Sequence, residues 1–271
     1  MTTKYTGDHI ENHDVQYYLD SIFQKISQEI VKRECTSEPE FLMNCLYQKF
    51  KIQFFSIMQL TYKRTINPSG KYSFLDIASI QTLIRSCFET YLTFEYIYNQ
   101  SSNESEIECK VLLYKRGSTS EFLRYDEDTK EYIQALQELQ QIDLQLKENE
   151  YFSLLCDKEI KVLKKSWRPS WMKIVDETIL SKTNNAYEYN QQSMYAHNSY
   201  HALMNLHHYY LNLDQYDVDA TNVQLFIITS LFSKSLIEWF KISPSLFTVD
   251  ELGIMGEFIT LAKRERHEIE Q

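Results

Sequence analysis

Turn-forming residues are scarce in this chain, which holds only five glycines and four prolines among its 271 residues. Sheet proteins need such residues at their many turns, so the scarcity argues against a sandwich or barrel and favours long helices. Hydrophobic residues make up 43% and aromatic residues 14%, enough to fill a sizeable core. Length and composition together predict one all-α domain over residues 1–271, a helical bundle of about eight to ten helices.

Other signatures are also missing. The five cysteines form no Cys-x-x-Cys pair, which predicts reduced core thiols and a cytoplasmic location. Residues 1–14 lack an apolar stretch and the most apolar window, 223–240, carries Lys234 and Glu238, so we expect no signal peptide and no membrane span. The net charge of -10 opposes general attraction to nucleic acid or anionic membranes, which leaves only a local basic patch. Without a glycine-rich phosphate loop, nucleophile elbow or dinucleotide fingerprint, kinase, ATPase, hydrolase and dehydrogenase functions lack support.

Apolar periodicity and capping residues predict the helices. Residues 15–31 show amphipathic spacing, Ser37 and Glu40 form a capping box for a second helix, and 74–99 is apolar almost all round, as expected of the central helix. The next helix is expected from about Glu104 to Lys115, and we expect Gly117 to break or bend it before a second short piece that reaches Tyr125. Residues 1–13 are predicted as a flexible leader and 128–150 as a projecting helical hairpin arm. Ser73 with Asp76 is expected to cap the helix that begins at 74, and Ser170 to cap a short helix that ends at about 181. Three further helices are expected over 186–211, over 222–242 and, after a capping box of Thr248 and Glu251, from 249 onward.

Arg85 and Glu89 stand four residues apart inside the apolar central helix, on one helix face. On a helix with so little polar surface, a guanidinium needs partners for its five donors. The pair fits a buried structural network, a functional site, or a simple exposed ion pair.

Ser193 and His197 show the same spacing on a later predicted helix. If His197 faces Glu89, the carboxylate would hold the imidazole in one tautomer and tune it as a general acid or base. Arg85 would then stabilise a developing anion such as a phosphorane. The alternative is that His197 is an ordinary core or surface histidine.

A metal site is the next hypothesis, because His197 and His201 have the spacing of the zincin pair and His207 follows where a third ligand would stand. Asn198, however, occupies the place of the catalytic glutamate, and Met204 replaces the glycine that lets the chain turn. On an unbroken helix His207 would lie roughly 80° off the face of His197. No Glu-x-x-His occurs for a di-iron bundle. We therefore predict no metal and no other cofactor.

Residues 158–173 interleave cations with tryptophans, a composition that suits RNA or single-stranded nucleic acid. The candidate binding residues are Lys161, Lys164, Lys165, Trp167, Arg168 and Trp171. The alternative is a solvated helix end whose tryptophans fill the core.

The Arg-Ser-x-x-Glu-x-Tyr segment from Arg85 to Tyr91, paired with Ser-x-Tyr-Ala-His from Ser193 to His197, resembles an uncharacterised family of all-α, mainly microbial proteins. These are distantly similar to the HEPN superfamily. HEPN domains are helical bundles, commonly dimeric, and many are metal-independent ribonucleases of toxin, abortive-infection and other defence systems. Their hallmark arginine, which four to six residues separate from the catalytic histidine, is absent here, where 190–192 are Asn, Gln and Gln. Arg85 would have to supply that guanidinium.

The resemblance implies a cytoplasmic homodimer that binds RNA and cleaves it, with His197 as acid or base, Arg85 as phosphate stabiliser, and Glu89 and Ser193 orienting them. The alternative is a non-catalytic module that binds a partner protein, in which Arg85, Glu89 and His197 only fix helix register. A third possibility is a pocket for a small ligand, lined by several of the twenty tyrosines.

Overall fold

The computed structural model describes residues 12–62, 65–66, 73–180, 189–190, 192–197, 199–211 and 218–269. It confirms the all-α class, with only a pair of two-residue antiparallel strands, β1 (Thr65–Ile66) and β2 (Ser73–Phe74), among the described residues. The expected eight to ten helices are too few, since these residues form eleven labelled α-helices besides shorter 3-10 and π-helices. Capping residues divide the region after residue 148 into short helices that periodicity alone does not separate.

The chain divides into two compact units. Unit 1 comprises Met1–Glu34, Tyr47–Tyr91 and Ile179–Gln271, and unit 2 comprises Cys35–Leu46 and Leu92–Thr178. Both α2 (Glu38–Tyr62) and α3 (Ile77–Phe94) contribute residues to each unit. Each unit is described by itself, and the single domain expected over residues 1–271 stays a prediction.

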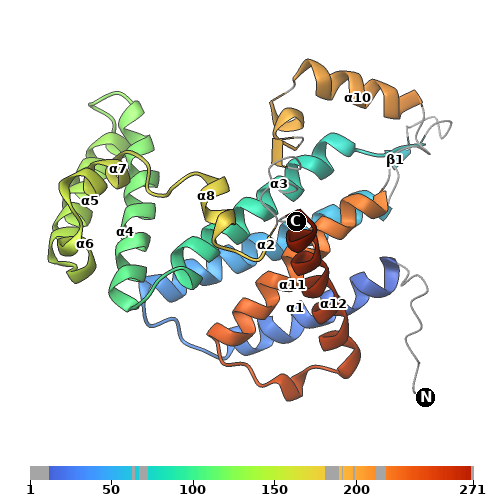
Figure 1. Ribbon diagram of the computed structural model, residues 1–271. Helices are drawn as coiled ribbons and strands as arrows, with labels where there is room; N and C mark the ends of the chain where they lie inside the picture. The colour runs from blue at the N-terminus through green and yellow to red at the C-terminus, as the bar shows by residue number, and fades with distance from the viewer. Residues whose placement is uncertain are drawn as a thin grey trace. The chain divides into compact units, whose positions relative to one another are not determined.

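Unit 1 holds the N-terminal and C-terminal helices. Besides its parts of α2 and α3, its labelled helices are α1 (Asn12–Val31), α10 (Tyr200–Leu211), α11 (Val218–Trp239), the short 3-10 helix η4 (Pro244–Leu246) and α12 (Val249–Ile269). Helices α1, α11 and α12 pack against one another (Figure 1). The predicted leader falls mostly on residues 1–11, outside the described residues, and α1 already begins at Asn12.

Aromatic side chains form the centre of unit 1. Phe23 of α1 meets Phe54 of α2 edge to face, with ring centroids 5.3 Å apart. Phe50, one turn earlier on α2, contacts Phe232 of α11 at 4.8 Å. All four side chains are fully buried, and such ring pairs add to the free energy of burial. The spacing predicted an amphipathic helix, and the structure shows that its apolar stripe packs against α2 and α11.

Helix α3 is buried along one side and partly open along the other. Ile80, Ile84 and Phe88 are fully buried, whereas Thr82 is exposed. The expected capping pair at its start is corrected, because Asp76 accepts a hydrogen bond from the Ser79 amide at 3.1 Å. The last turn widens into a π-helix, η1 (Glu95–Asn99), in which the Gln100 amide bonds the Glu95 carbonyl at 2.9 Å.

Unit 2 is organised around a helix that starts after a polar turn. Its elements after η1 are α4 (Glu104–Ser120), the 3-10 helix η2 (Glu121–Arg124), α5 (Lys130–Glu148), α6 (Glu150–Leu154), α7 (Asp157–Lys165) and α8 (Trp171–Asp176). Helix α4 packs against α5, α6 and α7. The region 128–150, expected to project as an arm, holds α5, whose apolar stripe packs against α4.

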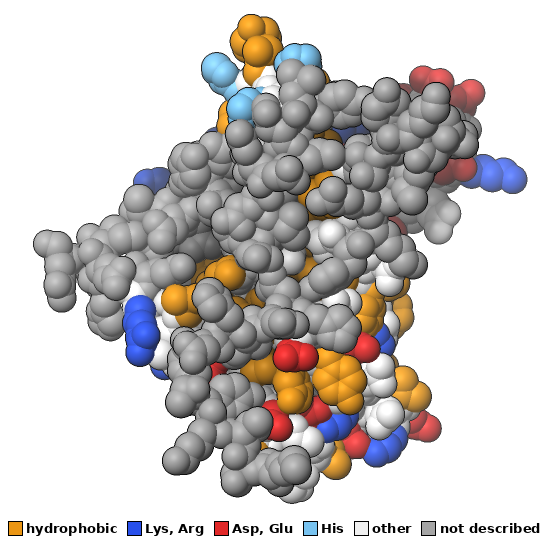
Figure 2. Space-filling model, turned by 90° about the vertical axis from the view of Figure 1, so that its right-hand side faces the viewer, with side chains coloured by type: hydrophobic (Ala, Val, Ile, Leu, Met, Phe, Trp, Pro, Cys, Tyr) orange, Lys and Arg blue, Asp and Glu red, His pale blue; other side chains and the backbone are white. Residues whose placement is uncertain are grey.

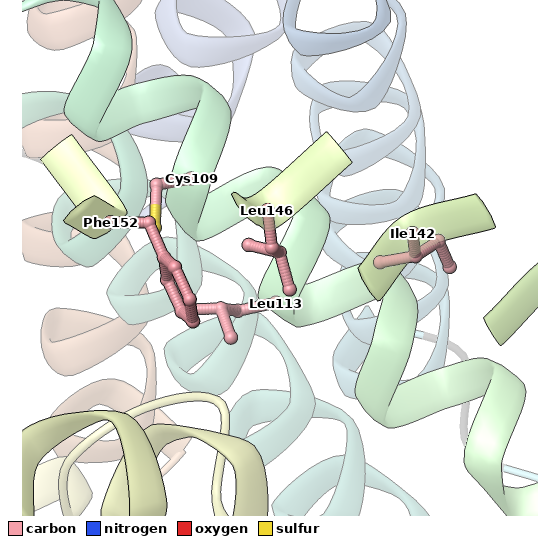
Figure 3. Close-up of a cluster of buried hydrophobic side chains, with 5 residues drawn as sticks. All are labelled: Cys109, Leu113, Ile142, Leu146 and Phe152. Atoms are coloured by element: carbon pink, nitrogen blue, oxygen red, sulfur yellow. The ribbon is translucent and has the colours of Figure 1, made fainter. Parts of the chain in front are cut away.

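A hydrophobic cluster joins the helices of unit 2. Figure 3 shows Cys109 and Leu113 of α4 facing Ile142 and Leu146 of α5 and Phe152 of α6. All five are buried, which stabilises the unit by removing apolar surface from water.

Gly117 lies inside α4 and does not break it, contrary to the sequence-based expectation. A Cβ atom at this position would lie 3.0 Å from Cδ1 of Trp167, so the glycine admits the indole ring against the helix. The helix continues because its hydrogen bonds do not depend on the missing side chain.

The cysteines and the apolar helices bear on the expected location. Cys87 and Cys109 are buried thiols, while Cys35, Cys45 and Cys156 are exposed, which corrects the expectation that the thiols lie mostly in the core. All five are free thiols that form no disulfide. Among the described residues, none of the helices combines the length and apolarity that a membrane span requires.

Candidate functional site

The candidate site of unit 1 is built on Arg85, on the open side of α3. Its Nε atom donates to Oε1 of Glu89 at 3.1 Å, which confirms the i,i+4 pair. The side chains of Arg85 and Glu89 are 18% and 30% exposed. The pair therefore lies at the edge of the core rather than inside it, and the cost of desolvating its charges is reduced.

Tyr189 completes this pair and is a residue that the sequence analysis missed. Its hydroxyl accepts from Nη2 of Arg85 at 3.1 Å and donates to Oε1 of Glu89 at 2.9 Å. The Arg85 guanidinium also lies over the tyrosine ring, 5.0 Å from its centroid. The available signal was spacing, because Tyr189 precedes Ser193 by four residues. We refer to Arg85, Glu89 and Tyr189 as the Arg85 network.

The electrostatics of the network favour a permanently charged guanidinium. Partial burial disfavours the charge of Arg85, but the hydrogen bond with Tyr189 and the charge of Glu89 outweigh it and raise the pKa of Arg85. Burial and the negative charge of Glu89 raise the pKa of Tyr189. The tyrosine thus stays a neutral hydrogen-bonding group, and Arg85 stays a cation.

His197, which is distant from Arg85 in the sequence, contacts the Arg85 network through its ring. Its Nε2 atom lies 3.5 Å from Nη1 of Arg85, a long hydrogen bond in which the guanidinium donates. The ring proton then belongs on Nδ1. Unlike Arg85, His197 is exposed. The two side chains that the sequence singled out are therefore brought together, with the imidazole on the solvent side.

The helix predicted over 186–211 is wrong in its length. Residues 189–190 and 192–196 are helical, and the His197 amide closes the last turn on the Ser193 carbonyl at 3.1 Å. Helix α10 then begins at Tyr200, because the Ser199 hydroxyl caps it by accepting from the Ala202 amide at 3.2 Å. Residues 181–188 lie outside the described residues.

Ser193 does not join the site through its side chain. Its carbonyl holds the turn at His197, while its hydroxyl makes no hydrogen bond to another described residue. Its expected orienting role therefore finds no contact here, because Tyr189 bonds Arg85 and Glu89 in its place.

Because the helical segment ends at His197 and α10 begins only at Tyr200, His197 is on a different helical segment from the histidines of α10. Figure 2 shows histidine side chains beside hydrophobic ones at the top of the view, where α10 lies in Figure 1. His201 and His207 are exposed there. Among the residues that the structure describes, no group of three His, Cys, Asp or Glu side chains is placed to hold a metal ion.

The candidate nucleic-acid residues lie in unit 2, and they do not share one surface. Lys161 and Lys165 are exposed on α7. Lys164 forms an ion pair with Asp143, with Nζ 3.5 Å from Oδ1. The ring of Trp167 packs against Tyr114, with centroids 4.7 Å apart, and is not free to stack on a base.

Arg168 and Trp171 form a pair of their own. The Arg168 guanidinium lies 3.3 Å from the centroid of the Trp171 ring, and its Nη1 donates to the Pro169 carbonyl at 2.9 Å. Ser170 caps α8 through the Lys173 amide at 3.3 Å, as the sequence predicted. The same guanidinium lies 5.5 Å from the centroid of the Trp167 ring, so it contacts both tryptophans, and Trp167 in addition packs against Tyr114.

The fold and this site define a helical protein with a half-buried Arg85 network and an exposed histidine against it. Comparisons with known protein families, with curated proteins and with solved structures find no match for the chain. The functional argument therefore depends on the residues themselves.

Proposed function

We propose that this protein is a HEPN-like ribonuclease, which binds RNA and cleaves it without a metal ion. The observation that supports this most is the exposed side chain of His197, whose Nε2 lies 3.5 Å from a guanidinium nitrogen of Arg85. An acid or base beside a permanent cation suits attack on a phosphodiester, because the cation stabilises the charge that develops on phosphorus.

The chemistry is an in-line transfer. When the phosphate takes over Nη1 of Arg85, Nε2 of His197 is released. This nitrogen then takes the proton of the ribose 2′-hydroxyl while the 2′-oxygen bonds to phosphorus and the bond to the 5′-oxygen breaks. The products are a 2′,3′-cyclic phosphate and a 5′-hydroxyl, whose proton comes from a second acid. In the proposed cytoplasmic homodimer, His197 of the second copy supplies that proton. Arg85 binds the phosphorane oxygens.

The Arg85 network supports this assignment by fixing the cation. Glu89 and Tyr189 bind Nε and Nη2, which leaves Nη1 directed at the exposed histidine. Preorganised donors of this kind reduce the reorganisation needed in the transition state. In this proposal the exposed Lys161 and Lys165 contact RNA phosphates, and the protein serves in a defence or toxin system.

The alternative is a non-catalytic module for a protein partner. It is favoured by the closed triangle of hydrogen bonds among Arg85, Glu89 and Tyr189, which satisfies these groups without any ligand. The net charge of -10 also opposes RNA binding. In that case the network only holds α3 against the helical segment that carries Tyr189.

The test is degradation of a mixed RNA pool by purified protein in the presence of a chelator. Wild type is compared with Arg85→Lys, His197→Ala and Tyr189→Phe, with His201→Ala as the matched control for loss of an exposed histidine. Melting temperatures are measured on the same samples. We expect cleavage to fall by at least about a hundredfold in His197→Ala and to persist in His201→Ala.

Two outcomes would contradict the proposal. Wild-type protein that leaves RNA intact would favour the interaction module. Equal cleavage by wild type and His197→Ala would point to a contaminating nuclease.

A further inference from the structure

A pocket of about 590 Å³ opens in unit 2, between η1, α4, α7 and the start of α8. This volume suits a small organic ligand. All of its lining residues belong to unit 2, so the pocket is independent of the Arg85 network.

A buried ion pair forms one wall of the pocket. Lys110 Nζ lies 2.9 Å from Oε1 of Glu106, and both side chains are less than 10% exposed. The ammonium also donates to the Tyr96 carbonyl and the Ser101 hydroxyl, each at 2.9 Å, and Glu106 accepts from the Ser102 amide at 2.9 Å. The hydrogen-bonding capacity of this pair is used within the protein, so the two charges neutralise each other and are not offered to a ligand.

The remaining charges at the pocket are mainly positive. Lys158 and Lys173 line it, are exposed, and make no ion pair with any described residue. Arg168 also lines it and presents the guanidinium that covers Trp171. Besides the Lys110–Glu106 pair, the acidic lining residues are Glu177 and Glu159, which accepts from the Cys156 amide at 2.8 Å and keeps its charge, so three cations stand against two carboxylates. A cationic mouth is unexpected in a chain with a net charge of -10.

Apolar side chains supply the rest of the lining. Leu155, Val162, Leu163 and Pro169 face the pocket together with the ring of Tyr96. The Tyr96 ring also contacts Lys110, whose Nζ lies 4.5 Å from the ring centroid, and Trp167, whose ring centroid lies 6.0 Å away. A ligand with an apolar or aromatic body would lose water-exposed surface here while its charge stays at the cationic mouth.

We propose that this pocket binds a small organic anion that carries an apolar or aromatic body. Lys158 and Lys173 attract the anionic group at the mouth, and Val162, Leu163 and Tyr96 contact the body. The Lys110–Glu106 pair keeps the wall rigid without contributing net charge. The inference holds whether or not unit 1 cleaves RNA.

The test uses a matched pair of fluorescent probes in the full-length protein. 1-Anilinonaphthalene-8-sulfonate is an aromatic anion, and N-phenyl-1-naphthylamine is the same body without the sulfonate. We expect the sulfonate to bind at one site per chain, and the Lys158→Gln/Lys173→Gln variant to weaken it about tenfold. Binding of the neutral probe should stay within about twofold in the same variant.

Two further variants locate the probe. Lys161→Gln/Lys165→Gln removes the same charge from the exposed side of α7, away from the pocket lining, and should leave the affinity for the sulfonate within about twofold. Val162→Trp fills the pocket from a position that is 57% exposed, so it should fold normally and abolish binding of both probes. Thermal melts on each variant check the fold.

Three results would overturn the proposal. They are absence of sulfonate binding by wild type, unchanged affinity in Val162→Trp, and equal losses in the two lysine variants. The last would show that the anion responds to general charge rather than to this pocket.

Discussion

Nη1 of Arg85 lies 3.5 Å from Nε2 of His197, although 112 residues separate them in the sequence. The contact joins a side chain that is 18% exposed to an exposed imidazole. Arg85 keeps Glu89 and Tyr189 as partners when the histidine is removed. Catalysis and stability can therefore be tested separately at this site.

His197→Ala should change the free energy of unfolding by less than about 0.5 kcal/mol, because the imidazole is exposed and its one side-chain bond is long. Arg85→Met should cost more, about 1 kcal/mol, since it leaves Glu89 and Tyr189 without their cation. Urea denaturation measures both. A loss above about 1 kcal/mol in His197→Ala would instead favour a structural role for the histidine.

Tyr189→Phe should lower the free energy of unfolding by about 0.5–1.5 kcal/mol. The substitution keeps the ring beneath Arg85 but removes the hydroxyl that bonds both Arg85 and Glu89. Tyr200→Phe is the matched control, because Tyr200 is 72% exposed. Equal effects in the two variants would mean that the network contributes nothing to stability.

Gly117→Ala should destabilise unit 2, although alanine is the better helix former by roughly 1 kcal/mol. The new Cβ would lie 3.0 Å from Trp167 Cδ1, so the indole must move out of its packing against Tyr114. Gly256→Ala on α12 is the control. No atom lies within 4 Å of its Cβ position, so the same substitution should stabilise the protein by about 0.5–1 kcal/mol.

These two glycine variants are compared by thermal and urea unfolding. A stabilised Gly117→Ala variant would show that Trp167 moves aside at little cost.

Stability should fall in acid, and Glu251 should account for part of the loss. Burial opposes its ionisation, but hydrogen bonds from Lys25, Ser21 and the Thr248 amide outweigh this and hold the pKa of Glu251 below its ordinary 4.5. Since the pKa is lower in the folded state, the stabilisation is present above pH 4.5 and is lost as the pH falls through the folded value.

The check is urea unfolding of wild type and Glu251→Gln between about pH 6 and pH 3. The variant should be less stable at the upper pH and lose less on acidification. Its residual slope comes from Glu106 and Asp143, whose pKa values are also lowered, against burial, by hydrogen bonds from the Ser102 amide and Lys110 and from Arg116. Identical slopes for the two proteins would refute the assignment.

The sequence by itself determined the all-α class and several helix starts. The capping box of Thr248 and Glu251 is present, with the Thr248 amide 2.6 Å from Glu251 Oε2, and Ser170 caps α8. The Arg85–Glu89 pair was predictable for the same reason. Each of these contacts joins residues within four positions of each other, so local geometry is enough to specify them.

Tertiary structure alone decided what those elements contact. It placed His197 against Arg85, brought Tyr189 between Arg85 and Glu89, and packed Trp167 against Gly117. It also ended a helix at His197, where periodicity predicted continuation. Apolar spacing states which face of a helix is buried but not which helix covers it, and that choice depends on burial and packing summed over segments distant in the chain.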